Sequence, residues 1–448
     1  MKKLFSSALI LSGTMFLAAC GGGAEPAIPV APGGEEATAP TTPEPTAPES
    51  DTTQLTLWHI QTFETRAAVI QDAVDRFVAA NPQYTVEVVP IMNDVYKQTL
   101  IIAMAANELP DIFVSWAGGP MIEYLTAGHL YDMTDMFNAT NLSDRILPGA
   151  IAQGQYNGRQ WGIPTENVAI AAVYYNRDIF ARLGLTVPNT IGELENVAET
   201  LVDNGYIPFA LANASMWTGS MYYMNLATRY AGLEPFQTAV IGTGSFEHPS
   251  FEFAGSRIQD WVERGFFAPG FNGADEDAGQ SRQLLYAELA AMHIMGNWFI
   301  SQVQNEYPEF LDRLGVFNFP AYENSNADPN IVIGTLGDNF MHISSSTSHP
   351  QSAFDLITFI IDDQAMAGRQ AAGALPPVIG LTSDIPLAQE VLAIIENATA
   401  VQLWYDQYLP PAVAQAHLNS SQELFGLTMT PQEANAIKQA AIEAHRDE

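Results

Sequence analysis

The sequence predicts an α/β fold, because apolar runs of strand length alternate with segments of helical periodicity. The run LTLWHI at 55–60 predicts a strand, and apolar residues between 67 and 78 recur at helical spacing until Asn81 and Pro82 end the segment. The same order then repeats, with a strand at 84–91, a helix at 96–106 and a short strand at 111–116. This alternation is typical of a parallel sheet with crossover helices.

The later part of the chain continues the mixture of strands and helices in a less regular order. Asn157 and Gly158, between Tyr156 and Trp161, are typical of a tight hairpin turn. Further strands are predicted at 168–175, 290–295, 316–319 and 340–344, and further helices at 191–204, 250–264, 353–362 and 432–445. No internal repeat is evident.

Composition and charge exclude several classes of protein. The 448 residues are 47% apolar, which is too much for an intrinsically disordered chain and enough for two or three ordinary domains or one large two-lobed unit. With 17 basic and 50 acidic residues the net charge is −33, which disfavours binding to nucleic acid or to anionic membrane surfaces. The single cysteine excludes an internal disulfide framework.

The first twenty residues have the pattern of an export signal. Lys2 and Lys3 precede an apolar run at 4–16, which is short for a membrane span. The sequence LAAC at 17–20 resembles the bacterial lipoprotein box, in which the cysteine thiol is acylated. We expect a signal peptide at 1–19 and lipidation of Cys20. The alternative is an ordinary cleaved signal with an accidental cysteine.

Residues 20–53 form a segment of a different composition. Between 21 and 53 there are seven prolines, no basic residue and few large apolar side chains. Such a sequence buries too little surface to fold, so it predicts a lipidated, Pro/Thr/Glu-rich tether that holds a globular body away from the membrane. The body is expected to begin near Gln54, outside the cytoplasm, at the outer face of the cytoplasmic membrane and exposed to the periplasm or the cell surface.

Signatures of enzymes and cofactor sites are missing from the sequence. No H-E-x-x-H, G-x-S-x-G or G-x-x-x-x-G-K pattern occurs. The acidic run at 275–277 departs from the calcium-loop pattern and favours a solvated loop, and the eight histidines are scattered. We therefore expect no catalytic residue, no metal site and no cofactor. A pair of carboxylates for glycoside hydrolysis cannot be identified among 50 acidic residues.

Four segments carry a resemblance to a known family: LPDIF at 109–113, YNGRQWGIP at 156–164, YYNRDIF at 174–180 and MGNWF at 295–299. With the lipoprotein start and the order of elements, residues 54–448 resemble the extracellular solute-binding proteins of carbohydrate ABC transporters, the maltose-binding-like class. The resemblance implies a two-lobed α/β solute-binding-protein fold with a ligand cleft between the lobes.

The resemblance also suggests how the chain divides between the lobes. Lobe 1 is expected to contain 54–166 and 331–375, and lobe 2 to contain 167–330 and 376–448. Chain crossings between the lobes are expected near 164–169, 319–331 and 375–380, each of which contains Pro or Gly.

Candidate ligand-binding residues follow from the rule that ligands collect at the carboxyl ends of strands in open α/β sheets. An indole face suits the C–H face of a pyranose, and glycine lets backbone approach a ligand closely. The candidates at predicted strand ends are His59, which follows Trp58, then Trp116, Gly118, Asn297 and Trp298. For each Trp the alternative is a core position, since Trp is often largely buried.

Four more candidates lie near the expected crossings and in loops. Glu166 and Asp338 are expected to accept hydrogen bonds from sugar hydroxyls, with a solvated surface position as the alternative for each. Trp217, in the loop-like stretch ANASMWTGS, and Trp404 are expected to form further walls of the cleft. Trp161 and Trp261 are instead assigned to structure, the first in the hairpin and the second on the apolar face of a helix.

Together with the residues above, the resemblance implies a monomeric protein that binds an extracellular sugar, an oligosaccharide, by hinge closure. It would deliver the sugar to the membrane permease of an ABC transporter, touch the membrane only through its lipid, and bind no nucleic acid. Two alternatives from other classes stay open, a surface-anchored glycoside hydrolase and a non-catalytic adhesive lipoprotein. Within the binding class, a peptide or polyol ligand is a further alternative.

Overall fold

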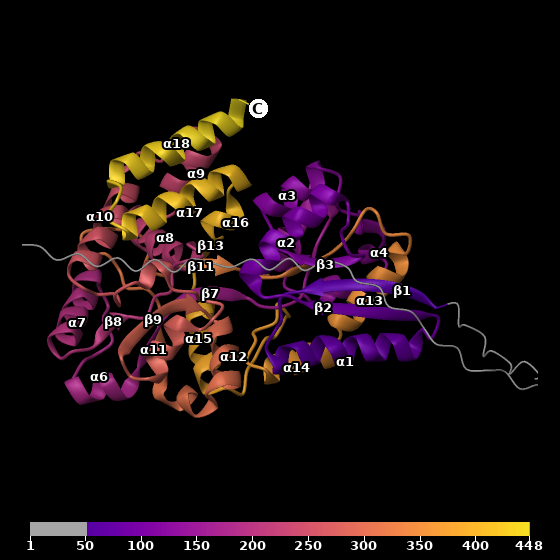
Figure 1. The fold of residues 1–448 in the computed structure, drawn as a ribbon, viewed down its shortest axis with the longest axis horizontal. Helices are drawn as coiled ribbons and strands as arrows, with labels where there is room; N and C mark the ends of the chain where they lie inside the picture. The colour runs from indigo at the N-terminus through magenta and orange to yellow at the C-terminus, as the bar shows by residue number, and fades with distance from the viewer. Residues whose placement is uncertain (1–51, 448) are drawn as a thin grey trace, which may run out of the picture. The chain divides into compact units, whose positions relative to one another are not determined.

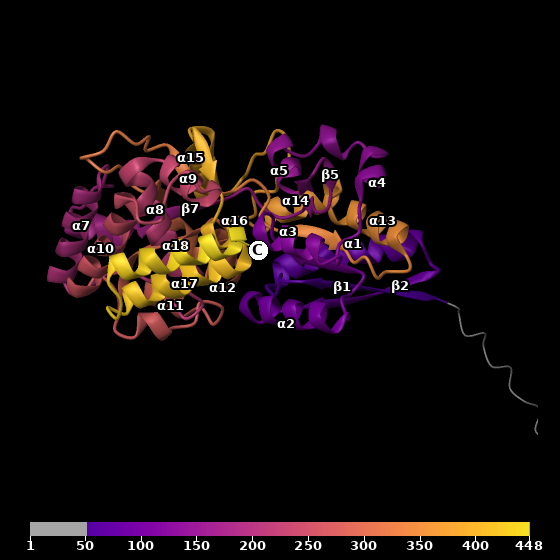
Figure 2. The same cartoon turned by 90° about the horizontal axis from the view of Figure 1, so that it is seen from above.

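The computed structural model describes residues 52–447, and these residues build two large β-sheets, each with its own hydrophobic core, and a small two-stranded sheet, β4-β5 (Figures 1 and 2). The predicted signal peptide at 1–19, the lipidated Cys20 and nearly all of the tether lie outside the described residues. Within 52–447, no helix combines the length and the apolar character that a membrane span requires. We call the part built on the five-stranded sheet the first lobe and the part built on the six-stranded sheet the second lobe.

The first lobe begins with the alternation that the sequence predicts. Its sheet has the strand order β2-β1-β3-β12-β6, in which β1 pairs in parallel with both β2 and β3, whereas β12 is antiparallel to β3 and β6. The sheet is therefore mixed, and the prediction of a parallel sheet holds for its first three strands. Its elements are β1 (Thr53–His59), α1 (Glu64–Ala80), β2 (Tyr84–Pro90), α2 (Asn93–Ala106), β3 (Ile112–Ser115), α3 (Gly119–Thr126), α4 (Thr134–Asn138), α5 (Pro148–Gln153), β4 (Gln155–Tyr156), β5 (Arg159–Gln160), β6 (Ile163–Pro164), β12 (Phe340–Ile343), α13 (Pro350–Ile360) and α14 (Asp363–Ala371).

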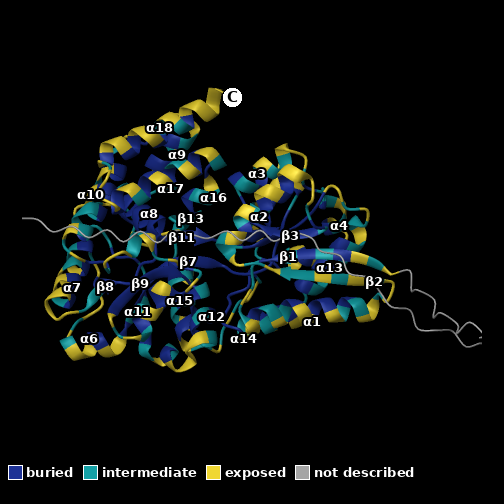
Figure 3. Ribbon diagram, viewed as in Figure 1, coloured by how far each residue is buried: buried dark blue, intermediate teal, exposed yellow. Residues whose placement is uncertain are grey.

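The second lobe is built around β7, a strand with seven of its eight residues buried. Its sheet has the order β13-β11-β7-β9-β8, with β10 also paired to β7, and helices including α7 and α10 surround it (Figure 3). Its elements are β7 (Ala169–Asn176), α6 (Arg177–Leu183), α7 (Ile191–Asp203), β8 (Ile207–Phe209), α8 (Trp217–Ala231), α9 (Glu234–Ile241), α10 (Pro249–Glu263), α11 (Gln280–Tyr286), β9 (Ala290–Gly296), α12 (Trp298–Glu306), β10 (Leu314–Phe317), β11 (Ile331–Thr335), α15 (Pro386–Glu396), β13 (Ala400–Gln402), α16 (Tyr405–Tyr408), α17 (Pro411–Phe425) and α18 (Pro431–Asp447).

The chain passes between the two sheets at three places. The first passage, at 165–168, joins β6 to β7 and lies within the predicted 164–169. The second differs from the prediction of 319–331, because β11 pairs with β7 and β13 in the second sheet and the passage falls at 336–339. Residues 331–335, expected in lobe 1, therefore belong to the second sheet. The third passage leads from α14 to α15 and includes the predicted 375–380.

Of three further local predictions, one is confirmed and two differ from the structure. The hairpin at 157–158 is present, with φ of 51° at Asn157 and 74° at Gly158, as a tight turn of this kind requires. The strand predicted at 316–319 lies two residues earlier, as β10. Trp217, expected in a loop, is instead the first residue of α8.

Candidate functional site

A cavity of about 350 Å³ lies between the two lobes and is lined by residues of both. The first lobe contributes residues from the ends of β1, β2 and β3, and the second lobe contributes residues from the starts of α8 and α12. The lining consists of Ile60, Gln61, Thr62, Phe63, Arg66, Met92, Asn93, Lys97, Trp116, Asn167, Trp217, Met221, Met224, Glu276, Asp277, Ala278, Arg282, Trp298, Ser301, Gln302, Glu306, Asp338, Asn339, Trp404, Asp406 and Gln407.

Four tryptophans from distant parts of the chain meet in this cavity. Trp298 lies between Trp217 and Trp404, with ring centroids 6.0 Å and 5.9 Å apart and interplanar angles of 60° and 63°. Trp116 faces the Lys97 ammonium at 5.1 Å. Trp116 and Trp404 are almost fully buried, whereas Trp217 and Trp298 are partly exposed and thus more accessible to a molecule in the cavity.

The position of Trp298 depends on the glycine two residues before it. Gly296 ends β9, and a Cβ at this residue would lie 2.2 Å from the Trp298 ring. Only a glycine therefore lets the indole lie against the end of the strand. The six-membered ring of Trp298 thus lies against the end of β9, and the side chain lines the cavity.

Several buried polar atoms of the cavity lining have no hydrogen-bond partner within the described part of the chain. They come from both lobes and include donors as well as acceptors. Buried polar groups are normally paired, so such atoms indicate a place where a polar molecule binds. They are Arg66 Nε, Gln302 Oε1, Asn339 Nδ2, Trp404 Nε1 and Gln407 Oε1.

Three carboxylates of the lining make no ion pair within residues 52–447. Burial, with a smaller effect of the Glu166 charge, raises the pKa of Asp338 to about 7. Burial also raises the pKa of Asp277, and it raises the pKa of Asp406 against the attraction of Lys97. Each carboxylate is an acceptor for paired hydroxyl groups.

Arg282 organises a further part of the cavity wall. Its guanidinium, which is 2% exposed, pairs with Glu276 at 2.8 Å and with Glu306 at 2.9 Å. Burial raises the pKa of Glu276 to about 7, although the charge of Arg282 opposes the shift. Glu276 and Asp277 of the acidic run are therefore part of the cavity wall, and the expectation of a solvated loop is wrong for Glu276, which is buried.

Glu166 lies behind the cavity, in the first passage between the sheets. Its buried carboxylate pairs with Arg66 of α1 and, at 3.2 Å, with Arg369 of α14. Burial favours a higher pKa for Glu166, but the charges of Arg369 and Arg66 outweigh it and hold the pKa below its usual value. Arg66 also donates to Ser301 Oγ of the second lobe at 3.0 Å, so this ion-pair group joins both lobes.

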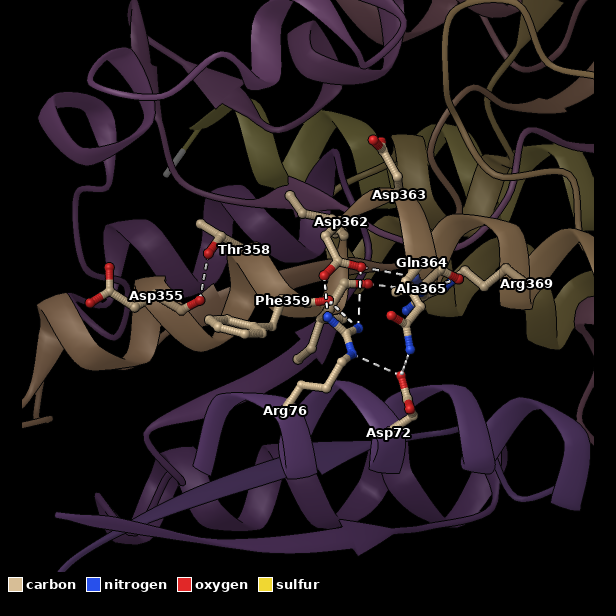
Figure 4. A network of polar contacts seen from close by, with 12 residues as sticks. Asp72, Arg76, Asp355, Thr358, Phe359, Asp362, Asp363, Gln364, Ala365 and Arg369 are labelled. Atoms are coloured by element: carbon tan, nitrogen blue, oxygen red, sulfur yellow. Dashed lines mark hydrogen bonds and ion pairs between the residues drawn. The ribbon is translucent and has the colours of Figure 1, made fainter. Parts of the chain in front are cut away.

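The helices that carry these two arginines are held together by a second polar network (Figure 4). Arg76 of α1 donates to both oxygens of Asp362, one of them at 3.2 Å, and Arg76 Nε pairs with Asp72 at 2.9 Å. Asp362 is also the N-cap of α14, accepting from Ala365 N–H at 2.9 Å. The network fixes α14 against α1 and thereby places Arg369 beside Glu166.

Similarity to a known protein family supports the interpretation of the cavity as a ligand-binding site between two lobes. Residues 63–367 match the model of the bacterial extracellular solute-binding protein family. The chain belongs to this family. The resemblance noted in the sequence is thus confirmed for the family, and so is the two-lobed α/β fold.

Individual relatives of this solute-binding protein cover most of its length. The multiple sugar-binding protein of Streptococcus mutans is 23% identical over 393 residues, covering 85% of this chain and 87% of the relative. A solved structure from work on xylan utilization by the thermophilic bacterium Caldanaerobius polysaccharolyticus has a TM-score of 0.81 and 28% identity, covering 87% of this chain and 99% of the other. A chitin oligosaccharide binding protein has a TM-score of 0.80 and 23% identity, covering 89% and 100%.

The nine candidate residues of this solute-binding protein divide into two groups. Five line the cavity, and four lie outside its lining. The lining group is Trp116, Trp217, Trp298, Asp338 and Trp404, and the second group is His59, Gly118, Glu166 and Asn297. The part that each plays in binding stays a prediction.

Three of the four residues in the second group contact backbone segments next to the cavity. His59 accepts from Gln61 N–H at 3.1 Å, and burial lowers the pKa of His59 to about 4. The amide of Asn297 bonds the backbone of Ile170 at 2.8 Å and of Val168 at 3.1 Å, which holds the first passage to the end of β9. Gly118 has φ of 76°, and a Cβ there would lie 2.3 Å from the Gln407 carbonyl oxygen.

Most charged residues of the cavity lining could not be predicted from the sequence. Arg66 and Lys97 lie on helices predicted from apolar periodicity, which says nothing about the polar face. Asn339 directly follows the candidate Asp338, and the acidic run at 275–277 favours a solvated loop when only the sequence is considered. Among residues 52–447, no group of three or more His, Cys, Asp or Glu side chains is arranged to hold a metal ion.

Proposed function

We propose that this solute-binding protein takes up an extracellular carbohydrate, an oligosaccharide, in the cavity between its lobes and delivers it to the membrane permease of an ABC transporter. The observation that carries the proposal is the combination of four indoles with unpaired donors and acceptors in one cavity. Apolar ring faces and polar edges are what a pyranose presents. The sugar ligands of relatives, including stachyose and raffinose, support the same class.

The proposed mechanism is closure of the two lobes around the sugar. Because lining residues come from both lobes, a sugar makes its full set of contacts only when the lobes are together. A ligand that binds one state better shifts the population toward that state. The permease would then recognise the closed form, and no bond of the sugar is broken.

We further propose that the protein is a monomer anchored by lipidation of Cys20 on the outer face of the cytoplasmic membrane. The support is the LAAC sequence after a basic, apolar start, followed by a proline-rich tether. Release of the protein from cells by Cys20→Ser tests the anchor. A C20S variant that remains in the membrane fraction would contradict it.

A thermal-shift screen tests the sugar ligand. The panel contains xylo-oligosaccharides, chito-oligosaccharides, raffinose, stachyose and galactose, and we expect at least one to raise the Tm by a few degrees at saturating concentration. Incubation of the same sugars, followed by chromatography, should show them intact. Cleavage at a useful rate would instead favour a surface glycoside hydrolase, and no stabilisation by any small molecule would favour an adhesive lipoprotein.

A further inference from the structure

The first turn of α2, in the first lobe, reaches across the cavity to Trp217 of the second lobe. Tyr96 and Leu100 anchor α2 in the first hydrophobic core, whereas Trp217 packs against the second. Asp94 and Lys97 lie on the same turn of α2, three residues apart, so both face one side of the helix. The contacts between this turn and Trp217 therefore exist only when the lobes are together.

Asp94 and Lys97 hold Trp217 in two different ways. Trp217 Nε1 donates to Asp94 Oδ1 at 3.1 Å, and Ser215 Oγ donates to the other carboxylate oxygen. The Lys97 ammonium lies 5.9 Å from the Trp217 ring centroid and 5.1 Å from that of Trp116. An edge contact and a contact to the ring face together fix the orientation of the indole.

The backbone is strained between the two donors to Asp94, which are the Ser215 hydroxyl and the Trp217 indole N–H. Met216, between Ser215 and Trp217, has φ of 66° and ψ of −35°, a conformation that side-chain-bearing residues rarely adopt. Trp217 N–H donates to the Ser215 carbonyl at 2.8 Å, which closes a tight γ-type turn. Strain of this kind persists only where surrounding contacts hold it, and it is concentrated at functional sites.

A second contact from the same turn completes the attachment. The backbone N–H of Asp94, at the start of α2, donates to Asp277 Oδ2 of the second lobe at 2.8 Å. Asn93, which lines the cavity, donates to Asp94 Oδ1 at 2.9 Å. Within residues 52–447, neither Asp94 nor Lys97 makes an ion pair, and both contact Trp217 of the second lobe.

We propose that Asp94 and Lys97 are positioning residues that clasp Trp217 across the cavity, so that the orientation of this indole and the closed state of the lobes depend on each other. The inference rests on the proposed function in one respect: the clasp serves to hold a sugar-binding wall. A sugar that favours the clasped indole then dissociates slowly, because its release requires the clasp to open.

Because the clasp itself favours the closed state, part of the sugar-free protein should be closed, so the clasp can be tested without any sugar. In the full chain labelled with 15N-tryptophan, Trp217→Phe identifies the Trp217 indole among the seven indole signals. Asp94→Ala should move that indole proton upfield and speed its exchange with solvent, since the hydrogen bond is lost. Asp75→Ala, which removes an exposed carboxylate that accepts from Gln71 of its own helix α1, should leave the signal unchanged. An unchanged Trp217 signal in D94A would overturn the clasp.

The functional consequence is tested with xylotriose, chitotriose and raffinose, by measuring rates of binding and release. For each probe that binds the wild type, D94A should weaken binding about 10- to 100-fold, mainly through faster release, since a bond to a charged acceptor is lost. Asp94→Asn should restore part of the affinity, because the amide oxygen still accepts from the indole.

A double-mutant cycle separates the clasp from a general structural effect. Ser215→Ala alone should weaken binding, and in the D94A background it should add little, since both changes remove the same contact. Additive effects of the two changes, or slower binding with unchanged release, would overturn the inference. If none of the three sugars binds the wild type, the proposed function loses its support, whereas the indole signal still decides the clasp.

Discussion

Two tryptophans of the second lobe show how neighbours decide the role of a side chain. Trp261 is fully buried, stacked on Phe209 at 5.5 Å and 15°, and its Nε1 donates to Glu195 at 2.9 Å. Trp298 lies against a glycine at a strand end and lines the cavity. Both are aromatic residues near other aromatic residues, yet only Trp298 is placed to meet a ligand.

Alanine substitutions should separate these two roles. Trp298→Ala should weaken sugar binding by about 2 kcal/mol, roughly 30-fold in Kd, with little loss of fold. Trp116→Ala should also weaken binding. Trp261→Ala should lower the free energy of unfolding by about 3–5 kcal/mol, since it empties a packed core site. Calorimetric titration and urea unfolding measure the two quantities, and equal destabilisation by all three changes would assign the tryptophans to the core.

Asp338 gives a second expectation at the residue scale, in the dependence of stability on pH. Its pKa in the folded protein is about 7, above the ordinary value of 3.8, mainly because of burial. As the pH rises from about 4 to 7, the unfolded chain loses this proton before the folded protein does, so ionisation of Asp338 costs stability until it is complete above pH 7.

Asp338→Asn should therefore raise the Tm of the sugar-free protein more at pH 8 than at pH 5. Glu276, whose pKa is also raised to about 7, shifts stability in the same direction and keeps part of the slope in the variant. Differential scanning fluorimetry over pH 5–8 gives the comparison. A Tm gain that is the same at both ends would show that Asp338 does not titrate in this range.

At the scale of elements, the attachment of α14 to α1 depends on one aspartate with two functions. Asp362 caps α14 and also accepts from Arg76 of α1. Since α14 carries Arg369, which pairs with Glu166 in the first passage between the sheets, the cap is connected to the region where the lobes join.

Substitutions at Asp362 should distinguish its two functions. Asp362→Ala should lower the free energy of unfolding by about 1–2 kcal/mol, because it loses both the cap and the ion pair. Asp362→Asn should lose about half as much, since asparagine is an equally good N-cap. Asp363→Ala, at a neighbouring exposed carboxylate, should change it by less than about 0.5 kcal/mol. Urea unfolding orders the three variants, and equal losses for Ala and Asn at 362 would assign the whole effect to the ion pair.

Elements with a clear periodicity could be predicted from the sequence, and those without one could not. The alternation of β1, α1, β2, α2 and β3 follows from local apolar patterns. Helix α8 has an almost continuous run of buried residues from Thr218 to Arg229, so no polar face marks it as a helix. All five residues of β11 are buried, a pattern that suits either sheet, and only its pairing with β7 assigns it.

The candidate site also contains residues that could be predicted from the sequence and residues that could not. Tryptophans at strand ends could be predicted because topology brings the ends of strands together. The charged wall formed by Arg282 and Glu276 could not, because the pairing depends on how loop 274–279 folds against α11. Likewise, nothing local indicates that Glu166 faces two arginines from helices 100 and 203 residues away.

At the scale of the whole molecule, the dominant quantity is the net charge of −33. Like charges spread over one compact body repel each other more than they do in the expanded chain. Salt screens this repulsion, with a Debye length of about 10 Å at 0.1 M. The folded state should therefore gain stability as salt is added, in contrast to proteins held mainly by surface ion pairs.

We expect the Tm to rise as NaCl increases from about 0.01 M to 0.5 M, over the range in which the Debye length falls most. Sucrose at matched osmolality provides the control for general exclusion of solute from the surface. Scanning fluorimetry in the two series gives the comparison. A Tm that falls with NaCl would show that attractive ion pairs outweigh the repulsion.

The narrow gap beside Gly118 and Gly119 also bears on engineering. At these residues the first lobe meets the carbonyl oxygens of Gln407 and Leu409 in the second, and an added methyl group would lie 2.3 Å and 2.0 Å from them. An added Cβ at either residue would therefore keep the two lobes from closing fully. Substitutions at these two residues should thus give receptors whose lobes close to different extents. Such a set of variants is a starting point for optical sensors built on this protein.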